Sequence, residues 1–406
     1  MLDESDHVVV IGAGLAGWRL VESLRRHGYA GSLTLVGQEP YAPYDRPPLS
    51  KQILAGKWDS HHSTLATPEL VASHDVTLRL GLGATALDVA TTTVQLQDGS
   101  TVEGTFVVVA TGSRARRLPF SADAELHTVR DRDDVIRLLS DLERLATGDV
   151  VAVIGGGFVG AEVATQLKVR GLRPVVLEAG RRPLHGVVGD EASQWLAPLA
   201  SWQEIELRNE VTITDVIRDG DGFSVEFANA EPLHARVVVV AAGALPNVEW
   251  LATSGLDIDN GVVVDRTMVA SERVAAIGDV ARFEWHAATG QEFVRIEHWE
   301  LANVHAQRLG LYLATGEVSP TPIVPYFWSD QYGKKIQMLG HPRASDDVVM
   351  VSGDADEGKW LCVYARDGLV SGVLALSNPR ALMLSKTVVE QTTTLAHALE
   401  RAPWVG

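Results

Sequence analysis

The chain is poor in sulfur that could take part in redox chemistry. Its 406 residues include one cysteine, Cys362. A lone cysteine excludes an intrachain disulfide, a redox-active cysteine pair and the cysteine-rich sites that hold zinc or iron–sulfur clusters. Cys362 lies late in the chain, where we interpret it as a small buried hydrophobe. Any electron transfer by this chain is therefore expected to proceed without thiols.

Positive charge is also scarce. The chain carries 35 Lys and Arg against 52 Asp and Glu, a formal net charge of −17, which argues against broad binding to nucleic acids or anionic membranes. The longest apolar runs, such as residues 237–245, reach about half of the ~20 residues that a spanning helix needs. The acidic first ten residues lack a signal-peptide pattern, and no His spacing suggests a metal site. We expect a cytoplasmic protein without nucleic-acid or membrane partners.

A glycine-rich turn follows the first β-branched run. Residues 7–11 predict a buried strand, residues 12–17 read Gly-Ala-Gly-Leu-Ala-Gly, and a helical pattern begins there. In such units the glycines allow a tight turn, a close approach of a pyrophosphate and close packing of helix on strand. The helix N-terminus offers free N–H groups to phosphate oxygens. A second predicted strand, residues 32–36, leads to Glu39, where an acid can accept ribose hydroxyls.

The same pattern is repeated 143 residues later. A strand at 150–154 leads to Gly-Gly-Gly-Phe-Val-Gly at 155–160, then to a helix and to a strand at 174–177 that is followed by Glu178. One glycine fingerprint is weak evidence, because such turns also serve tight packing alone. Two copies, each with its own strand, helix and acid, predict two dinucleotide sites.

Later strands in the sequence end in small residues. One leads into Ala110-Thr111-Gly112, another into a turn that contains Gly243, and a third into Gly278-Asp279. Open α/β sheets bind ligands at the carboxyl ends of their parallel strands. Gly-Asp by itself is an ordinary turn sequence.

These landmarks predict an α/β fold with two Rossmann-like dinucleotide-binding domains and a C-terminal α+β domain. At roughly 150 residues per domain, the length allows two to three. If the first fingerprint and Gly278-Asp279 serve one nucleotide, the second fingerprint is inserted between them. We predict a discontinuous first domain at 1–116 and 248–323, an inserted domain at 117–247 and a third at 324–406.

Alternating apolar and polar residues predict further antiparallel strands. Residues 76–102 and 211–234 read as hairpins around Asp-Gly turns. The tail reads as a small antiparallel sheet followed by a C-terminal helix, with strands near residues 335–339, 348–351, 360–365 and 369–375.

A proline-restricted loop at residues 44–51 ends in Lys51, which opens a predicted helix. Two nucleotides in one chain suggest hydride transfer between a nicotinamide and a flavin. A lysine beside the flavin N5 and C4 carbonyl would stabilise negative charge on the reduced ring. Composition alone favours a surface or capping lysine.

A series of motifs along the whole chain resembles one enzyme family. In order, they are G-A-G-L-A-G, Y-D-R-P-P-L-S-K, A-T-G-S-R, G-G-G-F-V-G-A-E, A-x-G-x-x-P-N, A-x-G-D-V-A, R-I-E-H-W and Y-F-W-S-D-Q-Y. Together they are similar to the oxygenase-coupled, FAD-dependent NADH:ferredoxin reductases of the putidaredoxin reductase type. The resemblance implies a glutathione-reductase-like fold with an FAD domain, an inserted NAD domain and a C-terminal domain.

The resemblance also implies the residues that contact FAD. The first glycine loop would hold the pyrophosphate, Asp279 would accept ribityl hydroxyls, and Trp299 would lie near the ring; Arg130 and Trp299 otherwise read as a solvated charge and a core aromatic. The implied contacts are Gly12, Gly14, Leu15, Ala16, Gly17, Gln38, Glu39, Arg46, Lys51, Ala84, Ala110, Thr111, Gly112, Arg130, Gly278, Asp279, Glu297, His298, Trp299 and Ala302.

For NADH, the resemblance implies the second glycine loop, with Glu178 on the adenosine ribose and Glu162 near the nicotinamide. Glu162 otherwise reads as an acid in the first turn of a helix, which the helix dipole favours. Lys51 and Glu162 are the implied catalytic residues. The remaining implied contacts are Gly155, Gly157, Phe158, Val159, Gly160 and Gly243.

Two features depart from the family pattern or bear on the choice of nucleotide. The family usually has Asp before the Glu that follows its second strand, whereas this chain has Gln38 before Glu39, so either residue could meet the FAD ribose. Arg181 and Arg182 could attract a 2′-phosphate, yet Glu178 would repel one. The sequence therefore favours NADH over NADPH.

The expected activity is hydride transfer from NADH to FAD, followed by two single-electron transfers to a 2Fe–2S ferredoxin that supplies a cytochrome P450 or ring-hydroxylating dioxygenase. The lack of a cysteine pair argues against disulfide reductases. Arg308, Lys334 and Lys335 are candidates for a cationic docking patch, with solvated surface charge as the alternative reading.

Other functions remain open from the sequence. One is a rubredoxin reductase, another is a flavin-dependent NADH oxidase, and the third is a redox-sensing flavoprotein of the apoptosis-inducing type.

Overall fold

The computed structural model describes residues 1–287 and 290–405. The chain forms two compact units, each built from three segments. Unit 1 comprises Met1–Asp45, Ser63–Arg114 and Leu245–Pro325, and unit 2 comprises Arg46–His62, Ala115–Ala244 and the chain from Tyr326 onward. The three-domain division with boundaries at residues 117, 248 and 324 stays a prediction.

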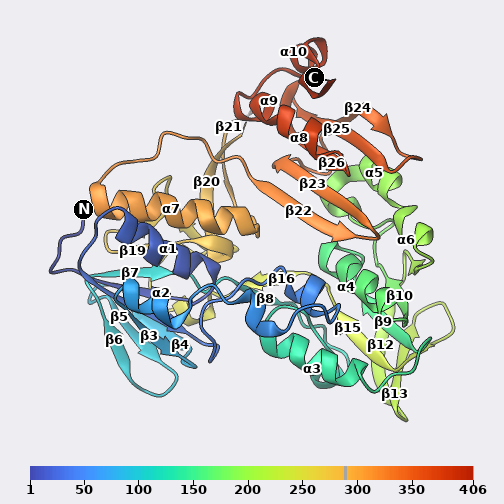
Figure 1. Ribbon diagram of the computed structural model, residues 1–406, viewed down its shortest axis with the longest axis horizontal. Coiled ribbons are helices and arrows are strands. Elements are labelled where there is room, and N and C mark those ends of the chain that lie inside the picture. Colours follow the sequence, from blue (N-terminus) through green and yellow to red (C-terminus); the bar gives the residue numbers. More distant parts are fainter. Residues whose placement is uncertain (288–289, 406) are drawn as a thin grey trace. The chain divides into compact units, whose positions relative to one another are not determined.

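Unit 1 is organised around a six-stranded sheet with strand order β18-β19-β7-β1-β2-β3 (Figure 1). The central strand β1 pairs in parallel with β2 and with β7. Near-continuous valine and leucine runs form these strands because both faces of a parallel sheet are buried. The strands are β1 (His7–Ile11), β2 (Ser32–Gly37), β3 (Val76–Leu80), β7 (Phe106–Val109), β18 (Val269–Ser271) and β19 (Val274–Ala276).

Two long helices of unit 1, α1 (Leu15–Arg26) and α7 (Trp299–Thr315), lie side by side (Figure 1). A Cβ atom added at Gly310 would lie 2.3 Å from the Ser23 Oγ. The two backbones therefore approach closely only because α7 carries a glycine at this position. The same unit contains α2 (Pro68–Ser73), β4 (Ala84–Asp88), β5 (Thr93–Leu96), β6 (Thr101–Glu103), β17 (Val262–Val264), β20 (Ala281–Ala287) and β21 (Gly290–Val294).

The predicted hairpins are confirmed in part. Strands β4, β5 and β6 form an antiparallel sheet, and residues 213–227 form an antiparallel pair in unit 2. The prediction was wrong for residues 76–80, because β3 extends the main sheet and pairs in parallel with β2. The register aligns Leu78 with Leu35, so apolar contact with the sheet outweighs the local alternating pattern.

The second glycine unit has its own parallel sheet, in unit 2. The strand order is β11-β10-β9-β15, with all neighbours parallel. The strands are β9 (Val150–Ile154), β10 (Arg173–Leu177), β11 (Glu206–Arg208) and β15 (Val237–Val240); the helices are α3 (Arg132–Leu142), α4 (Phe158–Val169), α5 (His185–Leu196) and α6 (Leu199–Trp202). The separate antiparallel sheet contains β12 (Ile213–Asp219), β13 (Gly222–Phe227) and β14 (Leu233–Ala235). The short strands β8 (Ser113–Ala115) and β16 (Ala244–Pro246) each contain residues of both units.

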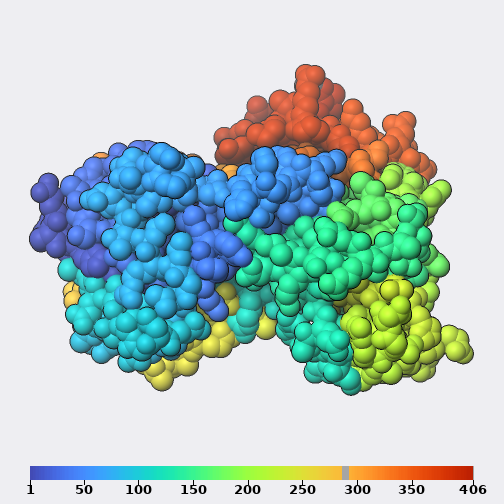
Figure 2. Space-filling model, turned by 60° about the horizontal axis from the view of Figure 1, so that its bottom comes forward, coloured from blue at the N-terminus to red at the C-terminus, as the bar shows by residue number. Residues whose placement is uncertain are grey.

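The C-terminal part of unit 2 is a five-stranded antiparallel sheet, so the predicted antiparallel sheet is confirmed, with one strand more than expected. Its atoms, orange to red in Figure 2, adjoin those of the inserted segment in green. Three short helices replace the single expected one. The strands are β22 (Tyr326–Gln331), β23 (Lys334–Gly340), β24 (Asp347–Asp354), β25 (Lys359–Arg366) and β26 (Leu369–Leu376), and the helices are α8 (Pro379–Leu384), α9 (Lys386–Glu390) and α10 (Leu395–Arg401).

Cys362 lies in β25 and is fully buried. Burial raises the pKa of its thiol to about 12, which removes the thiolate that redox and nucleophilic chemistry need. The interpretation of Cys362 as a small buried hydrophobe is confirmed. Within the described residues, no helix has the length and apolarity to cross a bilayer, and no cluster of His, Cys, Asp and Glu is arranged to hold a metal ion.

A buried carboxylate, Asp346, joins the segment between β23 and β24 to strands β25 and β26 of the C-terminal sheet. It accepts hydrogen bonds from Arg366 Nε at 2.9 Å, Ser371 Oγ at 2.6 Å and the backbone N–H of Arg343 at 3.0 Å. Burial alone would raise the pKa of Asp346, but these donors outweigh it and hold the pKa below its ordinary value. The carboxylate therefore stabilises the fold in its charged form.

We expect Asp346→Asn to lower the free energy of unfolding by about 3–5 kcal/mol at pH 7, because it removes the negative member of a largely shielded ion pair, in which the side chains of Arg366 and Asp346 are 12% and 2% exposed. The pKa of Asp346 is lower in the folded than in the unfolded state. The contribution of Asp346 to the free energy of unfolding is therefore fully present above its unfolded-state pKa and is lost as the pH falls through its folded-state pKa. Urea unfolding at pH 7 and pH 3 measures both effects. The control is Asp221→Asn, which removes an exposed partner of Arg236 and should cost under about 1 kcal/mol. Equal losses in the two variants would contradict the assignment.

Candidate functional site

The first glycine loop joins β1 to α1 and has the geometry of a phosphate-binding turn. Gly12 has φ +123°, and a Cβ atom there would lie 2.1 Å from the carbonyl oxygen of Ala110. A Cβ atom at Gly17 would lie 2.1 Å from the Gly12 oxygen, whereas one at Gly14 would have nothing within 4 Å. Gly14 caps α1 without a side-chain hydrogen bond. Two glycines thus serve packing, and the third leaves the helix N-terminus open to an anion.

The loop packs against a second turn that carries Asp279. Gly278 has φ +73°, and its Cβ position lies 2.9 Å from Ala16 Cβ and 3.9 Å from Ala302 Cβ. The Gly278 N–H donates to His305 Nδ1 at 3.3 Å. Burial lowers the pKa of His305 to about 3, so its neutral ring can accept this bond. The structure therefore places Ala16, Gly278 and Ala302 together, and their contact with FAD stays a prediction.

Asp279 follows this turn in a single 3₁₀ turn, Gly278–Val280. Its Oδ2 accepts a hydrogen bond from Ser113 Oγ at 3.2 Å, and its backbone oxygen accepts one from Arg295 Nη1 at 3.2 Å. Arg295 also pairs with the predicted site residue Glu297. Asp279 is only partly buried, and a carboxylate can accept hydrogen bonds from hydroxyl groups such as those of a ribityl chain.

The segment after β7 is fastened to the segment around Asn247. Thr111 Oγ1 donates to the backbone carbonyl oxygen of Asn247, and Asn247 Nδ2 donates to the backbone carbonyl oxygen of Thr111, both at 2.8 Å. Ala110 is buried, while the Cβ position of Gly112 faces open space at φ +64°. The paired side chains hold this predicted FAD segment at the carboxyl end of β7.

Trp299 is the first residue of α7, and its indole Nε1 donates to Asp45 Oδ1 at 2.8 Å. Burial raises the pKa of Asp45 despite this hydrogen bond. Trp299 is thus fixed by a polar contact rather than packed as a plain core aromatic. Other predicted residues of unit 1 occupy element ends: Leu15 begins α1, Ala84 begins β4 and His298 caps α7.

The second loop, between β9 and α4, repeats the geometry of the first. A Cβ atom added at Gly155 would lie 2.4 Å from the backbone oxygen of Ala241, and one added at Gly160 would lie 2.0 Å from the backbone oxygen of Gly155. A Cβ atom at Gly157 would have nothing within 4 Å. Gly157 caps α4 without a side-chain hydrogen bond. Phe158 and Val159 form the first helical positions, and Gly243 has φ +92° with open space at its Cβ position. A second dinucleotide pyrophosphate fits this turn.

The two loops differ in the residue that follows the second strand. Glu178 Oε2 accepts the Gly156 N–H at 2.7 Å, and Oε1 accepts the Gly180 N–H at 2.6 Å. The equivalent position in the first unit is Gly37, the last residue of β2, where a Cβ atom would lie 2.6 Å from the Ala13 Cβ. A side chain at the middle position of the loop and a side chain at the end of the second strand would therefore occupy the same space.

In the first unit, an acid lies two positions after Gly37, at Glu39. Gln38 is exposed, whereas Glu39 is partly buried and its Oε2 accepts a hydrogen bond from Tyr44 at 2.5 Å. Both side chains remain candidates for the FAD ribose.

The two predicted catalytic residues meet in unit 2. Lys51 lies in a π-helical turn, Leu49–Ile53, and its Nζ is 2.7 Å from Glu162 Oε2. Their side chains are 13% and 5% exposed, so the reading of Lys51 as a surface lysine was wrong. α4 begins at Phe158, which makes Glu162 its fifth residue, so the first-turn reading was wrong as well. A buried pair of this kind persists only when other groups satisfy its charges.

Two serine hydroxyls donate hydrogen bonds to the Glu162 carboxylate of this pair. Glu162 Oε2 also accepts from Ser50 Oγ at 2.5 Å, and Oε1 accepts from Ser329 Oγ at 2.6 Å and from the Asp330 N–H at 3.3 Å. We call Ser50, Lys51, Glu162, Ser329 and Asp330 the Glu162 cluster. Sequence reasoning singled out neither serine, although both lie in motifs, R-P-P-L-S-K and F-W-S-D-Q-Y, that carried the family resemblance.

The strand that supplies Ser329 runs along one face of α4. The rings of Phe158 and Phe327 are 4.2 Å apart between centroids, and the Tyr332 N–H donates to Thr165 Oγ1 at 2.8 Å. Phe158, Glu162 and Thr165 share one helix face by their spacing. The Glu162 contact therefore lies between two further contacts that fix its register.

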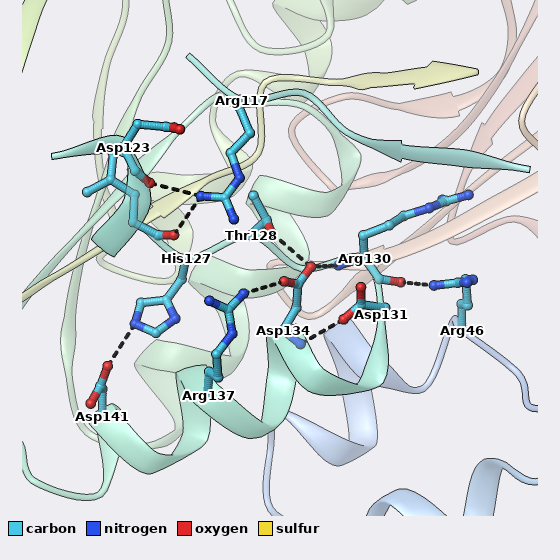
Figure 3. Close-up of polar contacts among 11 residues, drawn as sticks. Arg46, Arg117, Asp123, His127, Thr128, Arg130, Asp131, Asp134, Arg137 and Asp141 are labelled. Atoms are coloured by element: carbon cyan, nitrogen blue, oxygen red, sulfur yellow. Dashed lines mark hydrogen bonds and ion pairs between the residues drawn. The ribbon is translucent and has the colours of Figure 1, made fainter. Parts of the chain in front are cut away.

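Arg46 and Arg130, also predicted for FAD, are joined in unit 2. Arg46 Nη1 donates to the Arg130 carbonyl oxygen at 2.6 Å (Figure 3). Asp134 accepts from the Arg130 N–H and from Thr128 Oγ1, and Asp131 caps α3. The backbone that carries Arg130 is therefore held by α3 rather than solvated as part of a simple charge run.

The three candidate docking cations have separate environments. Arg308 donates to the Thr321 oxygen in unit 1, and burial lowers its pKa. In unit 2, Lys334 lies 5.8 Å from the Trp202 ring centroid, and Lys335 pairs with Asp330 at 3.2 Å. None of these contacts identifies a docking patch.

Comparisons with known proteins agree with this arrangement. Residues 6–306 match the family model "Pyridine nucleotide-disulphide oxidoreductase", and residues 326–403 match "Reductase C-terminal". Rhodocoxin reductase of Rhodococcus erythropolis is 33% identical over 94% of this chain and 89% of its own length. The ferredoxin–NAD(+) reductase subunit of the benzene 1,2-dioxygenase system of Pseudomonas putida is 32% identical over 95% of this chain and 93% of its own.

A solved structure gives the same result at the level of the fold. The reductase in a covalent putidaredoxin reductase–putidaredoxin complex aligns with a TM-score of 0.91 and 27% identity over 100% of both chains. This match confirms the predicted two Rossmann-like folds with a C-terminal α+β part. The chain belongs to the pyridine nucleotide-disulphide oxidoreductases, in the branch of ferredoxin reductases of dioxygenase and P450 systems.

Proposed function

We propose that this chain is an FAD-dependent NADH:ferredoxin reductase that delivers electrons to a 2Fe–2S ferredoxin of a cytochrome P450 or ring-hydroxylating dioxygenase system. The observation that carries the proposal is the pair of glycine loops with open, uncapped helix N-termini at Gly14 and Gly157. The relatives with this architecture are named as ferredoxin reductases. The buried, protonated Cys362 supports a route without thiols.

The residues of unit 1 fit FAD by their chemistry. The α1 N-terminus would bind the pyrophosphate through its N–H groups, and the Asp279 carboxylate would accept ribityl hydroxyls. Glu39 or Gln38 would accept ribose hydroxyls at the end of β2. Bound FAD supplies the conversion of a two-electron donor into single electrons.

The second loop would hold NADH in the same way. Its helix N-terminus would bind the pyrophosphate, and Glu178, fixed by two loop N–H groups, would accept the adenosine ribose hydroxyls. The negative charge of Glu178 would repel the 2′-phosphate of NADPH. Because FAD and NADH are cytoplasmic metabolites, we also propose the cytoplasm as the site of action.

Lys51 and Glu162 are the proposed catalytic residues. Lys51 would stabilise negative charge on the reduced flavin, and Glu162 would hold Lys51 and lie near the nicotinamide. These roles, and those of Arg46 and Arg130 toward FAD, are supported by the family resemblance together with the buried contacts described above.

The activity can be tested on the purified yellow protein. We expect NADH oxidation to be slow alone and to rise steeply when a 2Fe–2S ferredoxin and cytochrome c are added. Turnover that depends on oxygen alone would indicate an NADH oxidase, and a response to rubredoxin but no ferredoxin would indicate a rubredoxin reductase. NADH-driven dimerisation with little turnover would indicate a redox sensor.

Flavin binding depends on Asp279 in this proposal. We expect Asp279→Ala to purify without most of its FAD, because the ribityl hydroxyls lose their acceptor. The ratio of visible to protein absorbance measures the loss, and Asp88→Ala, an exposed aspartate of unit 1, should keep its flavin. A fully loaded Asp279→Ala protein would rule out the assigned contact.

Nucleotide choice depends on Glu178. We expect Glu178→Ala to reduce the preference for NADH over NADPH by about ten- to a hundredfold, because a charge repulsion and a ribose acceptor are lost together. Stopped-flow flavin reduction with both nucleotides measures it. Glu204→Ala, an exposed acid of the same unit, serves as control, and an unchanged preference in Glu178→Ala would contradict the ribose role.

A further inference from the structure

The Glu162 carboxylate holds more hydrogen-bond donors than an ion pair with Lys51 needs. Oε2 accepts from Ser50 Oγ and Lys51 Nζ, at 2.5 and 2.7 Å. Oε1 accepts from Ser329 Oγ and the Asp330 N–H, at 2.6 and 3.3 Å. Three of these four donors are neutral. The acid is therefore satisfied on both oxygens even without its cation.

The direction of the Ser329 hydrogen bond is fixed by a neighbour. Gln331 Nε2 donates to Ser329 Oγ at 3.2 Å, and the carboxylate can only accept. Ser329 must therefore turn its single proton toward Glu162. Ser329 is 0% exposed and Gln331 3% exposed, so water does not compete for this chain of bonds, and each bond polarises the next.

The neutral donors change what happens when Lys51 moves. A buried carboxylate stripped of its last partner is strongly destabilised, which would lock a lysine to it permanently. Here three donors remain after the ammonium leaves. The ammonium group of Lys51 lies at the end of a flexible four-carbon side chain. The Lys51 side chain is also the more exposed of the two, at 13% against 5% for Glu162.

We propose that Ser50 and Ser329 are positioning residues that keep the Glu162 carboxylate hydrogen-bonded and in place, so that Lys51 can leave it to stabilise negative charge on the reduced cofactor. The inference rests on the proposed function, because it gives Lys51 a destination at the flavin. It assigns the two serines a role through Lys51 and not through contact with either nucleotide.

The test compares holoprotein variants at fixed pH. Ser329→Ala, Ser50→Ala and the double variant remove neutral donors, and Ser329→Thr keeps the hydroxyl. Ser371→Ala is the matched control, because Ser371 is also a buried serine of the same sheet that donates to a buried carboxylate. The readouts are the midpoint potential of the bound flavin, the rate constant of flavin reduction at saturating NADH, and the dissociation constant for NADH.

We expect Ser329→Ala to slow flavin reduction about tenfold, because the loss of one charge-assisted hydrogen bond corresponds to a change of about that size. The dissociation constant for NADH should not change. Because Lys51 then stays on Glu162, the flavin potential should fall by about 30 mV, which is a tenfold change for a two-electron couple. The double variant should show a larger effect, and Ser329→Thr should restore both values. Ser371→Ala should match the wild type.

A double-mutant cycle with Lys51→Met separates this role from a packing role. If Ser329 acts through Lys51, then Ser329→Ala should not change the potential further in the Lys51→Met background. An equal shift in both backgrounds, no shift in either, or an equal shift in Ser371→Ala would overturn the inference. If Lys51→Met itself leaves potential and rate unchanged, the proposed role of Lys51 is what fails, and a protein that binds no FAD or reduces no ferredoxin refutes the proposed function.

Discussion

The close approach of each glycine loop to the neighbouring strand is the constraint on which both dinucleotide sites depend. At Gly12 and Gly155 a side chain would run into a backbone carbonyl within 2.4 Å or less. Backbone cannot yield in the way that the end of a flexible side chain can, so only glycine allows the helix to begin where its N–H groups face a ligand. The parallel sheets, the helix positions and the acids at the strand ends all follow from these two turns.

The same constraint explains why the two halves of the repeat are not copies. In each unit, the middle residue of the loop faces the residue at the end of the second strand. In the first unit Ala13 of the loop faces a glycine, and in the second unit Gly156 of the loop faces the Glu178 side chain. Filling both would bring side chains within contact distance of each other. The NAD-type unit thus carries its acid directly after the second strand, where the carboxylate of Glu178 accepts a loop N–H, and the FAD-type unit carries its acid later, at Glu39.

Much of this architecture could be predicted from local sequence. The strands, glycine turns and acids of both units lie within short windows, and their spacing reports the fold directly. The Glu162 cluster could not be predicted in the same way. Ser50 is 112 residues from Glu162, and Ser329 is 167 residues away, so no local pattern connects them. Lys51 was misread from composition for the same reason, since its burial depends on an acid supplied by another segment.

The buried thiol of Cys362 gives the C-terminal sheet an internal reporter. It lies on β25, between β24 and β26, and its chain contains no second sulfhydryl that could react in its place. A thiol-specific dye added to the native protein can therefore label this residue only when the strand separates from its neighbours. The labelling rate then counts openings of one sheet within a chain of 406 residues.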